Sequence, residues 1–437
     1  MRINFSIVLL LLFSSISLAH ATPRIQHWQS ASGAHVYFVE NHDIPMLDVA
    51  VYFAAGSGFN DPKRQGVAGL THDLMDLGTN QFSEDDIAKK IADLGAQLGG
   101  HFDTDRAGIS LRTLSSQNER EAALAVMAAV LQTPTFPEAI LQREKIRSIA
   151  ALKEAETKPE SIASKAFNQA VFGAHPYGAH AEVADVESIK RDDLLNFYRS
   201  HYAANDAIVA LMGDITRAEA EAIAQRLTAN LPAGGASRVL PAVTLNITAS
   251  EKRIEHPASQ SHILMGAPGI ARNDPDYFPL YVGNYILGGG GFVSRLMHEI
   301  REQRGMAYSV YSYFMPMQQV GAFQIGLQTK KEQADDALKY VRLTLNDFVK
   351  NGITESELKA AKQNIIGGFP LRIDSNKKIL DYLSAIGFYQ LPLTYLDDFS
   401  AKIDAVTTQQ IREAFQRRVH PNAMATVIVG APQGVTK

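Results

Sequence analysis

The chain has 437 residues, 46% of them hydrophobic, a formal net charge of -4 and no cysteine. The lack of cysteine excludes disulfides, a lipid anchor on cysteine and thiol catalysis. The length allows two or more domains with apolar cores. No basic block of the kind that binds nucleic acids stands out, so we expect no nucleic-acid partner.

The first 21 residues are predicted to be a signal peptide. Arg2 supplies a positive start, an apolar run follows over 7–13, and residues 19–21 read Ala-His-Ala, a form that signal peptidase cleaves. The apolar run is too short to span a bilayer, and no other segment is apolar for long enough. We therefore expect a periplasmic or secreted protein without a membrane span; a retained N-terminal anchor is the alternative.

Helical and strand patterns alternate along the chain, which predicts an α+β fold rather than a bundle or a sandwich. Apolar or alternating runs predict strands over 34–40, 47–54 and 205–212. Helical spacing of apolar residues predicts helices over 66–77, 83–94, 124–132 and 139–156. Ser83 and Asp86 have the spacing of a capping pair at the start of the second of these helices.

An internal repeat predicts two homologous lobes. Residues 192–213 (DDLLNFYRSHYAANDAIVALMG) align with residues 409–430 (QQIREAFQRRVHPNAMATVIVG). Asn-Asp-Pro also occurs at both 60–62 and 273–275, and the distance in sequence between these two copies is nearly equal to that between the two longer segments. The stretch 231–250, LPAGGASRVLPAVTLNITAS, is rich in proline and glycine and poor in charge. We therefore assign lobes to 22–230 and 251–437, with 231–250 as the linker.

Residues 66–79 read GVAGLTHDLMDLGT and resemble the zinc helix of the pitrilysin/insulinase family, G-x-A-H-x-x-E-H followed by Gly-Thr. That family includes the mitochondrial processing peptidases. Its two histidines bind zinc, and the glutamate between them acts as general base. The resemblance places Gly69 and Asp73 at the histidine positions, His72 at the base position and Ala151 at a distal glutamate position. It therefore implies that this chain binds no zinc.

Other catalytic sites have less support in the sequence. His72, Asp73 and Asp76 could form a rearranged metal site, but they lie on one helix and no third ligand from elsewhere can be placed. A polar helix face is the simpler interpretation. No Gly-x-Ser-x-Gly elbow is present. The stretch 172–178, FGAHPYG, also matches the family, and we expect its His175 to be structural.

The second lobe keeps the family's other catalytic element. Residues 287–312 read LGGGGFVSRLMHEIREQRGMAYSVYS and resemble its glycine stretch, S-R-L and R-x6-Y sequence. The resemblance assigns Arg301 and Tyr308 to that pair, which reaches the zinc site of the other lobe and stabilises the oxyanion of the reaction intermediate. Without this frame, a surface salt bridge and a core tyrosine would be the ordinary interpretation. The glycine run matches no phosphate loop and is expected to form a chamber wall.

Residues 98–104 (LGGHFDT) lie where the family has an exposed edge strand, to which a peptide can add by backbone hydrogen bonds. An ordinary edge strand protected by Asp103 and Asp105 is an equal alternative. The substrate-binding residues implied by the resemblance are Gly99, Gly100, His101 and Phe102.

Over residues 25–432, the resemblance implies two homologous lobes, each an antiparallel sheet flanked by helices, which form a clam-like shell. Because the zinc ligands are lost and the Arg/Tyr pair is kept, we expect the non-zinc subunit of a two-chain metallopeptidase. A homologous partner subunit would hold the zinc, this chain would hold none, and a peptide would be the substrate. A non-catalytic peptide-binding or assembly protein and a metalloendopeptidase with rearranged ligands remain as alternatives.

Overall fold

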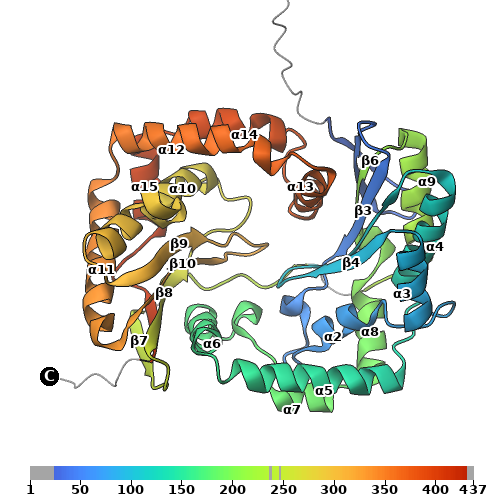
Figure 1. Ribbon diagram of the computed structural model, residues 1–437, viewed down its shortest axis with the longest axis horizontal. Coiled ribbons are helices and arrows are strands. Elements are labelled where there is room, and N and C mark those ends of the chain that lie inside the picture. The colour runs from blue at the N-terminus through green and yellow to red at the C-terminus, as the bar shows by residue number, and fades with distance from the viewer. Residues whose placement is uncertain (1–23, 236–238, 246–247, 431–437) are drawn as a thin grey trace, which may run out of the picture.

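The computed structural model describes residues 24–235, 239–245 and 248–430. The expected signal peptide over 1–21 lies outside the described residues, as do parts of the expected linker. Within the described ranges, no helix has the length and apolar character needed to cross a membrane. The two halves of the chain form two separate sheets on opposite sides of the molecule, each with helices on its outer side (Figure 1).

The first sheet has six strands in the order β1-β2-β6-β3-β5-β4, in which β2 and β6 are parallel and all other neighbours are antiparallel. Its strands are β1 (Gln26–Gln29), β2 (His35–Glu40), β3 (Met46–Phe53), β4 (Gln97–Phe102), β5 (Ala107–Leu114) and β6 (Ile208–Gly213). The helices of this half are α2 (Val67–Leu74), α3 (Glu84–Asp93), α4 (Gln117–Gln132), α5 (Glu138–Ala155), α6 (Pro159–Phe172), α7 (Val183–Ser188), α8 (Arg191–His201) and α9 (Arg217–Thr228).

The second sheet has five strands in the order β7-β11-β8-β10-β9, in which β7 and β11 are parallel. Its strands are β7 (Ser250–Ile254), β8 (Gln260–Pro268), β9 (Ala307–Phe314), β10 (Ala322–Lys330) and β11 (Ala425–Val429). The helices of this half are α10 (Tyr277–Asn284), α11 (Ala334–Asn351), α12 (Glu355–Gly368), α13 (Asn376–Phe388), α14 (Tyr395–Asp404) and α15 (Thr408–Arg418).

The two sheets share one topology. In the first sheet, β6 lies between β2, to which it is parallel, and β3, to which it is antiparallel. In the second sheet, β11 lies in the same way between β7 and β8. The repeated segments 192–213 and 409–430 are the corresponding helix–strand pairs α8–β6 and α15–β11. The predicted α+β fold with two related lobes is therefore confirmed.

Each half also contributes one helix to the other half. Helix α6 of the first half packs on β8 and β11, and α13 of the second half packs on β6 and β3. Both helices lie between the two sheets in Figure 1. A side chain at Gly387 of α13 would lie 2.5 Å from Ile208, so this glycine allows the helix to approach the first sheet closely. The exchanged helices join the cores of the two lobes.

Most predicted elements agree with the structure, and three boundaries differ by three residues or more. The helix predicted over 66–77 ends at Leu74. The strand predicted over 205–212 begins at Ile208, because Ala204–Asp206 form a short 3-10 turn. The helix predicted over 124–132 begins at Gln117. The prediction began too late because the first two turns are polar and show no apolar periodicity. The capping box of Ser83 and Asp86 at the start of α3 is present as predicted.

Candidate functional site

The helix that resembles a zinc helix, α2, is held by apolar residues on one side and directs its polar side toward β4. Its buried residues include Val67, Leu70 and Leu74. On the polar side, a side chain at Gly69 would lie 3.7 Å from the Phe102 ring. The longer side chain of a histidine at this position would meet that ring.

His72 fills the space beside this ring. Its ring centroid lies 5.5 Å from that of Phe102. Its Nε2 lies 3.3 Å from the carbonyl oxygen of Gly108 in β5, and its Nδ1 lies 3.0 Å from Asp73 Oδ1. A side chain at Gly100 would lie only 2.4 Å from His72 Nε2. The polar side of α2 is therefore packed against β4 and β5 through His72.

The residues at the zinc positions do not fit a zinc ion. Gly69 and Ala151 carry no ligand atom, and Ala151 is exposed on α5. Within the described ranges, no group of three or more His, Cys, Asp or Glu residues is placed to hold a metal. Asp76 is partly buried, and burial raises the pKa of its carboxyl group. The structure therefore gives no support to a rearranged site around His72, Asp73 and Asp76.

Arg301 and Tyr308 form one unit in the second lobe. Arg301 lies on a π-helical turn, η6 (Met297–Glu302), a feature common at functional sites. Tyr308 is the extra residue of a β-bulge, since Ala307 and Ser309 pair with consecutive residues of β10. A bulge of this kind redirects a side chain, and Tyr308 is 78% exposed. Arg301 Nη1 donates a hydrogen bond of 2.6 Å to the carbonyl oxygen of Tyr308.

The Arg301 side chain lies between two exposed aromatic rings. Its guanidinium carbon is 4.7 Å from the centre of the Tyr308 ring and 4.9 Å from that of Phe292, which is 64% exposed. Aromatic rings at these distances attract the positive charge of the guanidinium. The pair is thus a preassembled donor group on the surface. Phe292 follows the glycine run, and its contact with Arg301 could not be predicted from the R-x6-Y spacing.

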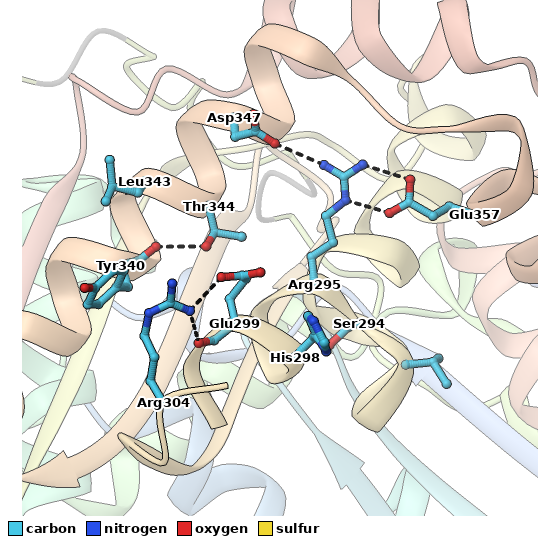
Figure 2. A pocket seen from close by; sticks show the side chains of 11 residues that line it. Ser294, Arg295, His298, Glu299, Arg304, Tyr340, Leu343, Thr344, Asp347 and Glu357 are labelled. Carbon is cyan, nitrogen blue, oxygen red and sulfur yellow. Dashed lines mark hydrogen bonds and ion pairs between the residues drawn. The ribbon is translucent and has the colours of Figure 1, made fainter. Parts of the chain in front are cut away.

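The turn that carries Arg301 is fixed to helices α11 and α12 by charged side chains, which Figure 2 shows from close by. Arg295 binds Glu357 through two hydrogen bonds of 2.7 and 2.8 Å and lies 3.5 Å from Asp347. Arg304 binds Glu299 at 2.7 Å. The contacts of Arg295 hold the turn in place, and Arg295, Arg304 and their carboxylate partners line a cavity of about 620 Å³.

The expected substrate strand is β4, an edge strand that pairs only with β5. The N–H of Asp103 bonds to the carbonyl of Arg106, so the alternation of antiparallel pairing directs the backbone groups of Leu98, Gly100 and Phe102 away from β5. His101 Nε2 lies 2.8 Å from Asp103 Oδ2. The strand thus offers backbone donors and acceptors along its outer edge.

His175 has a structural position: its Nε2 lies 2.8 Å from the Pro241 carbonyl oxygen, and its Nδ1 accepts from the Tyr177 backbone N–H. The structure brings Gly69, His72, Gly100 and Phe102 together in the first lobe, and Arg301 and Tyr308 together in the second. Among the described residues, no hydrogen bond or ion pair links these two groups.

Comparisons with known proteins agree with this architecture. Residues 36–184 match the family model described as insulinase (peptidase family M16), and residues 188–365 match the peptidase M16 inactive domain. The crystal structure of a peptidase M16 inactive domain from Pseudomonas fluorescens has a TM-score of 0.89 and 38% identity, and covers 93% of this chain and 98% of that chain. This chain belongs to peptidase family M16.

Two M16 relatives differ in what their names state. The non-peptidase homolog YmxG of Helicobacter pylori is 27% identical over 401 residues, which cover 90% of this chain and 91% of that protein. Mitochondrial-processing peptidase subunit beta of Mus musculus is 22% identical over 408 residues, which cover 90% of this chain and 81% of that protein. The match to the inactive-domain model and the name of the Helicobacter pylori relative support an inactive M16 member.

Proposed function

We propose that this chain is the subunit without zinc of a two-chain metallopeptidase. A homologous M16 subunit holds the zinc and the general base, and this chain supplies Arg301 and Tyr308 as donors to the oxyanion that forms on the scissile carbonyl. It also contributes part of the chamber wall. The observation that carries this proposal is the Arg301–Tyr308 unit, which is assembled and exposed in a chain whose own α2 has no ligand set.

The chemistry of the pair supports this role. A guanidinium and a phenol are both donors suited to developing negative charge, and the Arg301 guanidinium lies against the Phe292 and Tyr308 rings. Among the described residues, no carboxylate forms an ion pair with Arg301. The mouse relative is by its name a subunit of a processing peptidase, which is consistent with a two-chain enzyme.

The substrate in this proposal is a peptide that adds to the outer edge of β4. Gly99 and Gly100 carry no side chains that would block a second strand, and His101 and Phe102 flank them along the strand. Such pairing selects extended conformation more than sequence. The proposed complex is periplasmic or secreted, and its zinc belongs to the partner subunit.

The test is reconstitution with a homologous M16 subunit that carries H-x-x-E-H. The purified pair should cleave peptides, while each chain alone should be inactive and this chain should contain no stoichiometric zinc by mass spectrometry. Arg301→Ala and Tyr308→Phe should each lower kcat of the pair by about 10²–10³-fold, the usual effect of losing an oxyanion donor.

Arg304→Ala is the matched control, because Arg304 lies on the same segment but bonds to Glu299. It should keep full activity. Peptidase activity of this chain alone with bound zinc would refute the proposal. Unchanged activity in both Arg301→Ala and Tyr308→Phe would show that the pair has no catalytic role.

The second candidate function is peptide binding without hydrolysis. It is favoured by the open edge of β4, where the backbone groups of Leu98, Gly100 and Phe102 have no backbone partner among the described residues. Binding of an extended peptide by this chain alone, together with an Arg301→Ala variant that leaves every activity of the complex unchanged, would favour this function over the first.

A further inference from the structure

A buried carboxylate connects the two lobes at the end of β4. Asp105 is 1% exposed and lies in the turn between β4 and β5. Its Oδ1 accepts a hydrogen bond of 2.6 Å from the Tyr177 hydroxyl. Its Oδ2 accepts from the backbone N–H of Gln318 at 2.7 Å and from the Tyr389 hydroxyl at 3.0 Å. The Tyr177 hydroxyl in turn accepts from the N–H of Gln319 at 3.0 Å.

The segments that meet here belong to both lobes. The turn of Asp105 directly follows β4, the proposed peptide-binding edge. Gln318 and Gln319 lie in the loop over 315–321 that follows β9, and Tyr308 is near the start of that same strand. Tyr177 and Tyr389 follow the exchanged helices α6 and α13. One carboxylate therefore accepts hydrogen bonds from three elements that are distant in the sequence.

Charged groups surround this carboxylate without leaving it exposed. Asp103 acts on it from its own turn, and the guanidinium carbons of Arg106 and Arg272 lie 5.6 and 5.1 Å from the centre of the Tyr389 ring. Burial raises the pKa of Asp105 above its usual value, while its hydrogen bonds act in the opposite direction. Arg106 pairs with Asp103 at 3.1 Å, and the hydrogen bonds that Asp105 accepts compensate for the burial of its charge.

We propose that Asp105 is a positioning residue that fixes the β4 edge of the first lobe relative to the strand that carries Tyr308 in the second. The proposal rests on the proposed function for the roles of β4 and Tyr308, but the contact itself lies within this chain. Without the carboxylate, the Gln318 N–H and the two tyrosine hydroxyls lose their shared acceptor. The loop over 315–321 then loses the hydrogen bond from Gln318 to Asp105 that joins it to the turn.

Hydrogen–deuterium exchange on this chain alone tests the attachment. In Asp105→Ala, amides of the loop over 315–321 should exchange on the order of 100-fold faster, because buried hydrogen bonds to a charged group are lost. Asp105→Asn retains one acceptor oxygen and should give on the order of a tenfold increase, so it provides the answer if the alanine variant does not fold.

Asp103→Asn is the matched control. It removes a negative charge from the same turn, but the hydrogen bonds of the Asp103 side chain are to His101, Asp105 and Arg106, all within this segment. Exchange over 315–321 should stay within about twofold of wild type. Equal exchange in Asp105→Ala and wild type, or equal acceleration in the Asp103 and Asp105 asparagine variants, would overturn the positioning role.

A kinetic measurement separates positioning from simple structural support. In the reconstituted pair, Asp105→Asn should lower kcat by about tenfold and change KM by less than about twofold, because the β4 edge itself is intact and only its placement relative to Tyr308 changes. Full kcat despite faster exchange would overturn the proposal. The exchange experiment uses no partner, so its result is independent of whether a two-chain peptidase forms.

Discussion

Gly100 in β4 lies against the imidazole of His72. This contact can be tested by substitution. The methyl group of a Gly100→Ala variant would lie 2.4 Å from His72 Nε2 and 3.0 Å from the Gly108 carbonyl oxygen. At the neighbouring Gly99, a methyl group would meet only Ser110 Oγ, at 3.8 Å. Both glycines are in the same edge strand, so they form a matched pair.

The expected energies follow from these distances. Alanine in place of a strand glycine gains roughly 0.5 kcal/mol from lower backbone entropy in the unfolded state. Gly99→Ala should therefore be neutral or slightly stabilising. In Gly100→Ala the same gain is opposed by overpacking, which costs about 1–3 kcal/mol. We expect a net loss of about 1–2 kcal/mol in the free energy of unfolding.

The assay is urea unfolding of a double-mutant cycle. His72→Ala removes the imidazole, so Gly100→Ala should cost at least about 1 kcal/mol less in that background than in wild type. Gly99→Ala should show no coupling to His72→Ala beyond about 0.5 kcal/mol. An equal effect of Gly100→Ala in both backgrounds would refute the reasoning that the His72 imidazole packs against Gly100.

Two further predictions concern the metal position and pH. A variant with Gly69→His, His72→Glu, Asp73→His and Ala151→Glu should bind zinc only weakly in calorimetry, because the Phe102 ring faces position 69. Adding Phe102→Ala should strengthen zinc binding. Equal zinc affinity with and without Phe102→Ala would contradict the packing argument. Separately, the hydrogen bond from Arg295 lowers the pKa of Glu357 to about 2, so this pair stabilises the fold above the unfolded pKa of about 4.5 and loses the effect as pH falls from there toward 2. Since Glu357 is partly exposed, Glu357→Gln should cost about 1 kcal/mol near pH 7 and almost nothing near pH 2 in urea unfolding; a cost that does not change with pH would argue against the ion pair.

Local patterns predicted most elements because the evidence for them is local. The capping pair of Ser83 and Asp86 and the apolar runs of β2 and β3 depend on neighbouring residues, and the structure confirms them. The start of α4 at Gln117 was not predicted, because its first turns are polar and exposed. Only the packing of its later turns on β5 makes the whole segment helical.

The residues of the candidate site were identified by motif, but their arrangement was not. The R-x6-Y spacing identified Arg301 and Tyr308. The hydrogen bond between them depends on a π-helical turn and on a bulge that forms only when β9 pairs with β10. The place of Phe292 beside Arg301 also depends on that tertiary context.

The sequence by itself determined that Gly69 and Ala151, which the family resemblance aligns with zinc ligands, have no side-chain ligand atom in any fold. It also determined the duplication, because the repeated segments keep the same helix–strand pattern. Only the tertiary structure decided that Phe102 and His72 pack together on the polar side of α2, that α6 and α13 each pack on the sheet of the other lobe and that Asp105 connects the two lobes. These contacts join residues far apart in the chain, and their geometry follows from the packing of both lobes together.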